Sequence, residues 1–280
     1  MNAFSRSWEL VKASARVLQA DKELTIFPIV SSIATLIVSV LFFVPMFSAN
    51  LFDSLFMEKF QILGVVVMFF FYLAQYFVII FCNTALVGAA IIRLRGGDPT
   101  VRDGFRIAFS HLGSILGYAA IAATVGMILK AFSDRTKGVG RMVISLIGMA
   151  WNVATFLVVP VLAVEGIGPI DAVKRSVALL RRTWGEQIVG NMGLGAVFGL
   201  ATLGLILLGG AIIALVAIQF QIVWLAITLG VLLVLALVLL GLIQSTLSGI
   251  YTAAVYQFAV DGQAGSFFDE AMVRGAFRIQ

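Results

Sequence analysis

The residues that could carry chemistry are few and lie far apart along the chain. Glu165 is the deepest acidic residue in an apolar segment, His111 is the only histidine and Cys82 is the only cysteine. A metal site needs several His, Cys, Asp or Glu ligands at close spacing, and the sequence around His111 supplies none. The serines in apolar segments lack the base and orienting acid that a nucleophile requires. We therefore expect no catalytic residue, no metal and no cofactor.

Charged residues inside membrane spans usually mark ion paths and proton relays. The apolar segments of this chain contain essentially none in their interiors, and Glu165 lies at the end of one, directly before Gly166. At that place Glu165 is either solvated at a helix end or paired with Arg175. Transport coupled to a buried carboxylate is therefore disfavoured.

Uncharged polar side chains deep in the apolar segments give the one positive indication of a site. Lipid offers these groups no hydrogen-bond partner, so we expect them to converge on the interior of a helix bundle. Interhelical hydrogen bonds would account for them, and the functional alternative is a polar crevice that accepts a headgroup or another small polar molecule. The residues are Gln75, Asn83, Asn152, Thr155, Asn191, Gln244, Ser245 and Tyr251.

The segment 187–260 contains no Asp, Glu, Lys, Arg or His. Such a run is long enough for two membrane spans, each of which needs roughly 20 apolar residues. Hydrophobic residues make up 61% of the chain, charged residues 12%, and the mean hydropathy is +1.08. The net charge of +5 comes from basic clusters beside apolar segments, which favours membrane orientation over nucleic-acid binding. The chain is therefore predicted to be an integral membrane protein with no nucleic-acid partner.

Six spans in three hairpins account for the apolar segments, at 25–47 with 62–92, 112–130 with 142–164, and 188–216 with 223–247. The predicted fold is an all-α polytopic membrane bundle forming a single domain. Its parts are an amphipathic helix at 1–23, a hairpin at 25–92, an amphipathic helix and hairpin at 98–164, another such pair at 169–260, and a tail at 261–280.

A basic amphipathic helix is predicted before each hairpin. In the first, Phe4, Trp8, Val11, Ala15 and Leu18 form one apolar stripe, which lies either in the headgroup region or on the protein's own spans.

The second and third amphipathic helices follow Gly–Pro or Asp–Pro signals. In the second, Asp98 is predicted as the N-cap with Pro99 at the first helical position. The third follows Gly168–Pro169, and its predicted stripe is Val173, Val177, Leu180 and Trp184.

Counting Lys and Arg in the short loops places both termini on the cytoplasmic side of the membrane. A basic connection at 130–141 then falls outside, against the trend. The cytoplasmic residues expected to meet lipid headgroups form a rim of Arg6, Lys12, Arg16, Arg102, Arg106, Lys174, Arg175, Arg181, Arg182 and Trp184.

Three motifs carry a resemblance to a known family. They are PVLAVEG at 160–166, AVKRS at 172–176 and TWGE at 183–186. This stretch resembles a family of uncharacterised prokaryotic membrane proteins similar to the membrane domain of some glycerophosphoryl diester phosphodiesterases. The resemblance implies a six-helix membrane module without an assigned activity, and it transfers no catalytic residue.

The function predicted from these patterns is non-enzymatic interaction with membrane lipids, preferably anionic, or with a membrane-protein partner, which includes a second copy of the chain. The alternative is a passive permease or channel for a small polar or lipid-like molecule, built around the polar crevice.

Overall fold

The computed structural model describes residues 3–48, 61–183, 188–219 and 222–262, with side chains described for all of these except 3–10, 61, 182–183, 188–194 and 196. These residues are helical or in short connections and include no strand, which confirms the all-α prediction. The helices are α1 (Ala3–Ala20), η1 (Lys22–Thr25), α2 (Ile26–Ser48), α4 (Gln61–Leu94), α5 (Val101–Ser110), α6 (Leu112–Arg135), α7 (Val139–Ala154), α8 (Val158–Glu165), α9 (Pro169–Thr183), α10 (Ile188–Gln219) and α11 (Val223–Asp261).

Six stretches of the described chain are long and apolar enough to cross a membrane. They are Lys22–Ser48, Ile62–Leu94, Leu112–Arg135, Val139–Glu165, Val197–Gln219 and Val223–Asp261. They follow the predicted order of three hairpins, and the amphipathic helices α1, α5 and α9 precede them in turn. The protein is a multi-pass membrane protein.

Helix α4 lies at the centre of the molecule and packs against α2, α5, α6, α8 and α11. Its second half is rich in small residues, and Ala85, Ala89 and Ala90 are buried. Small residues allow helix backbones to approach closely in membranes. The approach is tightest at Gly104 on α5, where a Cβ atom would lie 2.7 Å from the carbonyl oxygen of Ala85.

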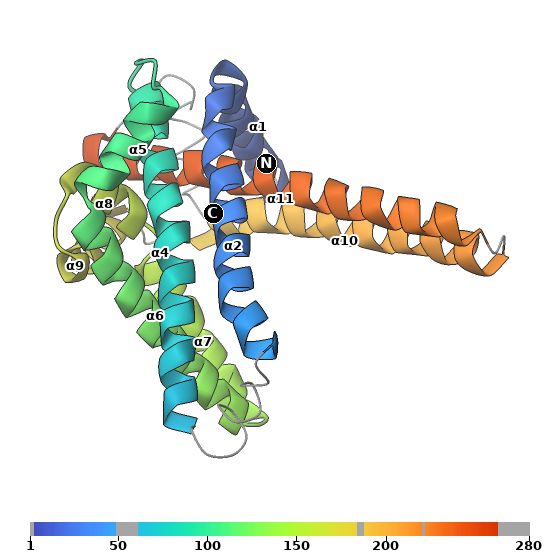
Figure 1. The fold of residues 1–280 in the computed structure, drawn as a ribbon. Helices are drawn as coiled ribbons and strands as arrows, with labels where there is room; N and C mark the ends of the chain where they lie inside the picture. Colours follow the sequence, from blue (N-terminus) through green and yellow to red (C-terminus); the bar gives the residue numbers. More distant parts are fainter. Residues whose placement is uncertain (1–2, 49–60, 184–187, 220–221, 263–280) are drawn as a thin grey trace.

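The third hairpin projects sideways from the bundle formed by α2, α4, α6 and α7 (Figure 1). We call α10 with residues 223–243 of α11 the arm, and the rest of the described chain the body. The arm is apolar on every side, and Leu208 and Leu239 are 69% and 60% exposed. The later part of α11 runs back behind α2 and α4 (Figure 1) and is buried there. The exposed apolar surface of the arm requires lipid around it.

The fourth predicted span, 142–164, is interrupted rather than continuous, because α7 ends at Ala154 and α8 begins at Val158. Pro160 has no N–H and cannot make the helical bond to the carbonyl of residue 156. Ser176 of α9 satisfies the groups freed at the break. Its Oγ accepts a hydrogen bond from the Leu157 N–H at 3.1 Å and donates one to the Ala154 carbonyl at 2.7 Å.

The start of α5 differs from the prediction. The N-cap is Thr100 and not Asp98, because Thr100 and Asp103 form a reciprocal capping box. Asp98 instead accepts a hydrogen bond from Arg93 at 2.8 Å. The two hydrogen bonds from Thr100 hold the pKa of the Asp103 carboxyl below its ordinary value.

Candidate functional site

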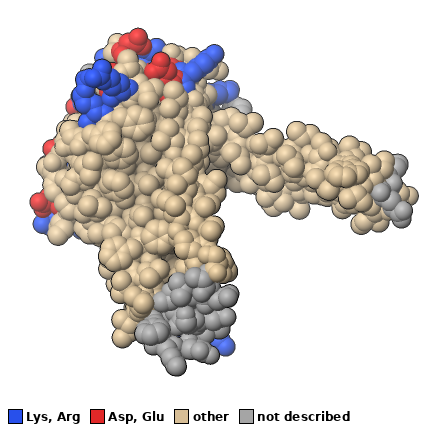
Figure 2. Space-filling view, in the orientation of Figure 1, with Lys and Arg blue, Asp and Glu red and all other residues tan. Residues whose placement is uncertain are grey.

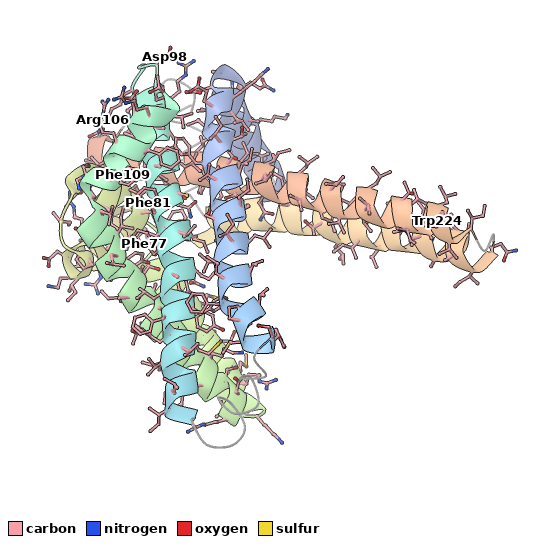
Figure 3. The ribbon with its side chains drawn as sticks, viewed as in Figure 1. Phe77, Phe81, Asp98, Arg106, Phe109 and Trp224 are labelled. Atoms are coloured by element: carbon pink, nitrogen blue, oxygen red, sulfur yellow. The ribbon has the colours of Figure 1, made fainter. Side chains whose placement is uncertain are left out.

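On the face that Figure 2 shows, the cations are most numerous at the end of the molecule where α1 and α5 lie, with carboxylates among them, and the arm shows none. Other described cations lie on α9 and at the connection between α6 and α7, where Lys130, Arg135, Lys137 and Arg141 are exposed. Figure 3 places Asp98 and Arg106 at the end where α1 and α5 lie, above the aromatic side chains Phe77, Phe81 and Phe109. Phe109 contacts Phe81 edge-on, with ring centroids 5.0 Å apart. Helix α5 therefore sits on α4 through aromatic rings and turns its cations outward.

Three of the predicted rim residues are engaged in ion pairs within the protein. Arg106 pairs with Asp103 at 3.2 Å, Lys174 with Asp171 at 3.1 Å, and Arg175 with Glu165 at 2.9 Å.

Three others, Arg16, Arg102 and Arg181, are exposed and form no ion pair with any residue that the structure describes. Lys12 is exposed as well. Arg6 and Arg182 have no described side chain, and Trp184 lies outside the described residues.

Helix α1 packs on the protein and not on lipid. Val11 and Val17 are buried, and Ala15 and Leu18 pack against the core, where α1 contacts α10 and α11. Of the two positions predicted for the apolar stripe, Val11, Ala15 and Leu18 therefore take the one against the protein's own spans. The side chains of Phe4 and Trp8, the other stripe residues, are not described. Lys12 and Arg16 face away from the contact.

Arg93 fastens the end of α1 to α4. It donates hydrogen bonds to the carbonyls of Ala20 at 3.1 Å and Gly97 at 3.2 Å, besides its pair with Asp98. Asp21 is buried next to it, and this burial raises the pKa of the Asp21 carboxyl, an effect that Arg93 partly offsets. Arg93 is thus a structural cation.

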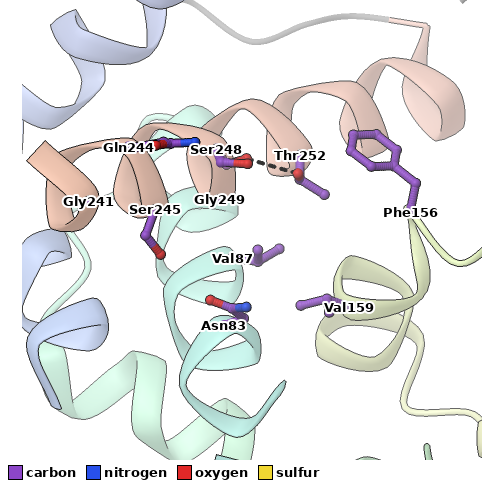
Figure 4. Close-up of a pocket in the computed structure, with 10 residues that line it drawn as sticks. All are labelled: Asn83, Val87, Phe156, Val159, Gly241, Gln244, Ser245, Ser248, Gly249 and Thr252. Atoms are coloured by element: carbon purple, nitrogen blue, oxygen red, sulfur yellow. Dashed lines mark hydrogen bonds between the residues drawn. The ribbon is translucent and has the colours of Figure 1, made fainter. Parts of the chain in front are cut away.

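A polar pocket of about 420 Å³ lies between α4, α8 and the buried part of α11 (Figure 4). The structure brings Asn83, Gln244 and Ser245 of the predicted crevice together here. The full lining is Asn83, Val87, Phe156, Val159, Gly241, Gln244, Ser245, Ser248, Gly249 and Thr252. None of the described lining residues is charged.

The amides in this pocket have no hydrogen-bond partner among the described residues. The side chains of Asn83, Gln244 and Ser245 make no hydrogen bond to any residue within the described ranges, whereas the Thr252 hydroxyl donates to the Ser248 carbonyl at 2.8 Å. Polar groups in a membrane protein are costly unless something bonds them. Asn83 and Gln244 are therefore open to hydrogen bonding by water or a polar ligand.

The other predicted crevice residues lie elsewhere. Gln75 ties α4 to α2, donating to the Thr35 carbonyl at 3.1 Å and to the Ser39 hydroxyl at 2.8 Å. Thr155 bonds within its own helix turn, to the Trp151 carbonyl at 2.8 Å.

Three further residues complete the predicted set. Asn152 is exposed on α7, and the side chain of Asn191 falls outside the described part. Tyr251 is buried with its ring centroid 6.4 Å from that of Phe156.

Glu165 joins three helices at one end of α8. The Arg175 Nε donates to both Glu165 carboxylate oxygens, at 2.9 and 3.1 Å, and the Tyr256 hydroxyl donates to Oε1 at 3.1 Å. Of the two roles predicted for Glu165, the structure shows pairing with Arg175. The contact of Glu165 with Tyr256 could not be predicted from the sequence, because Tyr256 is on α11, 91 positions away. Among the described residues, no group of three or more His, Cys, Asp or Glu is placed to hold a metal ion.

Comparison with known proteins supplies one match. The model of a family of unknown function, DUF6159, matches residues 62–267. The chain belongs to this family. Neither a curated protein nor a solved structure matches it. The predicted membership of an uncharacterised family is confirmed, and the similarity to the phosphodiesterase membrane domain stays a prediction.

The DUF6159 match runs from α4 to the end of α11. It contains the polar pocket, the arm, and the α8–α9 segment that holds the Glu165–Arg175 pair. Arg102 and Arg181 lie inside the matched range, whereas Lys12 and Arg16 lie before it.

Proposed function

We propose that this DUF6159 protein is a non-enzymatic membrane protein that binds anionic phospholipid at its cytoplasmic end. The observation that carries the proposal is a set of exposed cations on the three amphipathic helices, Arg16, Arg102 and Arg181, that form no ion pair with a described residue. On α5 and α9 the neighbouring cations Arg106, Lys174 and Arg175 pair with carboxylates, whereas these three are open to an external anion.

The position of the cations suits lipid phosphates. Each amphipathic helix adjoins an apolar span, which brings its charged face to the level of the headgroups. A basic residue near an anionic leaflet contributes roughly 1 kcal/mol. Arginine also binds phosphate through two parallel N–H donors. The positive-inside rule places this end of the molecule in the cytoplasm.

The test compares lipid retention between variants in nanodiscs of equal phosphatidylglycerol and phosphatidylcholine. The double variant Arg16→Gln, Arg102→Gln should lose roughly 30-fold in preference for phosphatidylglycerol, which is the effect of two cations at about 1 kcal/mol each. The double variant Arg135→Gln, Arg141→Gln, at the connection between α6 and α7, is the matched control because it removes two exposed arginines that lie outside the rim and form no ion pair with a described residue. An unchanged preference in the double variant contradicts the proposal.

The polar pocket supports a second candidate function, a passive permease for a small uncharged polar molecule. Asn83 and Gln244 offer both donors and acceptors without a described protein partner. Flux of glycerol or a similar polyol into proteoliposomes, reduced several-fold by Gln244→Leu and not by Gln75→Leu, would support it. Flux equal to that of protein-free vesicles contradicts it.

A further inference from the structure

A second hollow, apolar and not polar, lies between α7 and α9. Its volume is about 430 Å³, within the range of roughly 300–1,000 Å³ typical of ligand pockets. Among the described residues that line it, Arg181 is the only charged one. The lining is Leu146, Met149, Ala150, Val153, Ala154, Val177, Leu180 and Arg181, which we call the α7–α9 groove.

The groove forms where α7 presents small side chains toward α9, and no further helix of the described chain packs extensively over α7. Ala150 and Ala154 are one turn apart on α7. Helix α7 packs chiefly against α6 and α9, so its remaining face is open. Leu146 and Met149 are 54% and 50% exposed there.

The two walls of the groove are held at fixed spacing at one end. Ser176 of α9 bonds the backbone at Ala154 and Leu157, and Arg175 of α9 bonds Glu165. The groove is therefore a preformed feature of the body. Water does not stably fill an apolar hollow, whereas a hydrocarbon chain from the bilayer can.

Arg181 distinguishes this groove from an ordinary lipid-facing surface. Of the α9 cations with described side chains, Lys174 is paired with Asp171 and Arg175 with Glu165. Arg181 is exposed and has no ion pair with a described residue. A guanidinium without a described ion-pair partner, beside an apolar groove, complements a molecule that joins a phosphate to a hydrocarbon chain.

We propose that the α7–α9 groove binds one acyl chain of an anionic phospholipid, and that Arg181 binds the phosphate of the same molecule. The proposal rests on the proposed function and sharpens it to a single site. The polar pocket does not fit this ligand, because its described lining has no cation and half of the lining residues carry an amide or a hydroxyl group.

The experiment uses the full-length chain in phosphatidylcholine vesicles that contain a small fraction of phosphatidylglycerol with a photoreactive diazirine on one acyl chain. After irradiation, mass spectrometry of the digested protein measures labelling of 146–154 relative to 200–218 on the arm. The wild type should show labelling concentrated on 146–154. Arg181→Gln should lower that ratio several-fold, and Arg181→Lys should restore part of it because the charge returns.

Two further variants separate the groove from general effects. Ala150→Phe fills the groove and should remove the excess labelling while Arg181 remains. Arg141→Gln, which removes an exposed cation at the opposite end of α7, should leave the ratio unchanged. The Arg181 variants change an exposed residue, so the test stands even if Ala150→Phe does not fold.

Uniform labelling of 146–154 and 200–218, or a ratio that Arg181→Gln leaves unchanged, overturns the proposal. Native mass spectrometry of retained lipid tests the proposed function separately. If phosphatidylglycerol is retained preferentially but labelling is uniform, only the proposal that the α7–α9 groove binds an acyl chain is overturned. Equal retention of both lipids overturns the proposed function and the inference that rests on it.

Discussion

The two parts of α11 lie in opposite surroundings. Residues 223–243 form half of the arm. Within this stretch Thr228 is the one hydroxyl-bearing residue, and Leu235 is 53% exposed. Residues 246–257 pass through the body, and there Ile250 and Tyr256 are 0% and 1% exposed. The polar residues of the helix are concentrated in the buried part, which is the reverse of the pattern in a soluble protein.

The reversal follows from lipid as the solvent. Lipid tails are as apolar as leucine, so the arm gains little by burying its side chains in protein. Hydroxyl and amide groups find no partner in lipid and must lie against other helices or a pocket. Close packing and hydrogen bonds therefore hold the body together, and substitutions should be costly in the body and tolerated in the arm.

The largest contrast is expected between two glycines. In Gly104→Ala the new Cβ meets the Phe27 ring and lies 2.7 Å from the Ala85 carbonyl oxygen, so α4 and α5 must separate. We expect a loss of about 3 kcal/mol, at the upper end of overpacking costs. Gly210→Ala in the arm has nothing within 4 Å and should leave stability unchanged or slightly higher. Equal unfolding midpoints for the two variants in detergent would remove the distinction between body and arm.

The α7–α8 break gives the next effect. Ser176→Ala leaves the Leu157 N–H and the Ala154 carbonyl unpaired in a buried site. The expected loss is about 2 kcal/mol, from the cost of unsatisfied buried groups. Ser145→Ala, on the exposed face of α7, should cost nothing measurable. The midpoints of thermal unfolding of both variants measure this difference. A Ser176→Ala variant as stable as the wild type would show that water replaces the hydroxyl.

A smaller loss is expected from the hydrogen bonds between α2 and α4. Gln75→Leu removes the donor to Thr35 and Ser39 and should cost about 1 kcal/mol, the scale of interhelical bonds in membranes. Thr228→Val in the arm breaks only a bond within its own helix, to the Trp224 carbonyl, and should be neutral. Trp224 itself lies near the far end of the arm (Figure 3). A greater loss for Thr228→Val than for Gln75→Leu would contradict the comparison.

The smallest effect is expected at the water-facing end of the body. Hydrogen bonds from Thr100 lower the pKa of Asp103 in the folded protein. The folded state then binds fewer protons than the unfolded state, so this contribution to stability is present above the unfolded pKa and is lost as pH falls through the folded pKa. Asp103→Asn should flatten the decline of stability between pH 6 and pH 3. Asp134→Asn serves as the control for removing an exposed carboxylate, and equal slopes for the two variants would argue against the capping box as the cause.

The spans and the amphipathic helices could be predicted from the sequence, because segments such as 187–260 without ionisable residues leave little choice but lipid. The sideways course of the arm could not, because hydropathy is the same in every direction around α10. The break between α7 and α8 could not be predicted either. Its support, Ser176, comes from a helix 19 to 22 positions further along the chain.

One wall of the polar pocket could be predicted from the spacing of polar residues on α11. Gln244, Ser248 and Thr252 follow each other at intervals of four, which places them on one helix face. That periodicity indicates a polar face on α11. Its counterpart, Asn83, could be paired with it only once the packing of α4 against α11 was known.

The central claim is that the exposed unpaired cations bind anionic phospholipid. Native mass spectrometry of the protein gently extracted from its own membrane, with the retained lipids identified after release, tests it most directly. The account predicts an anionic phospholipid at fixed stoichiometry, enriched over its share of the membrane. Retained lipids in the same proportions as the bulk membrane would contradict it.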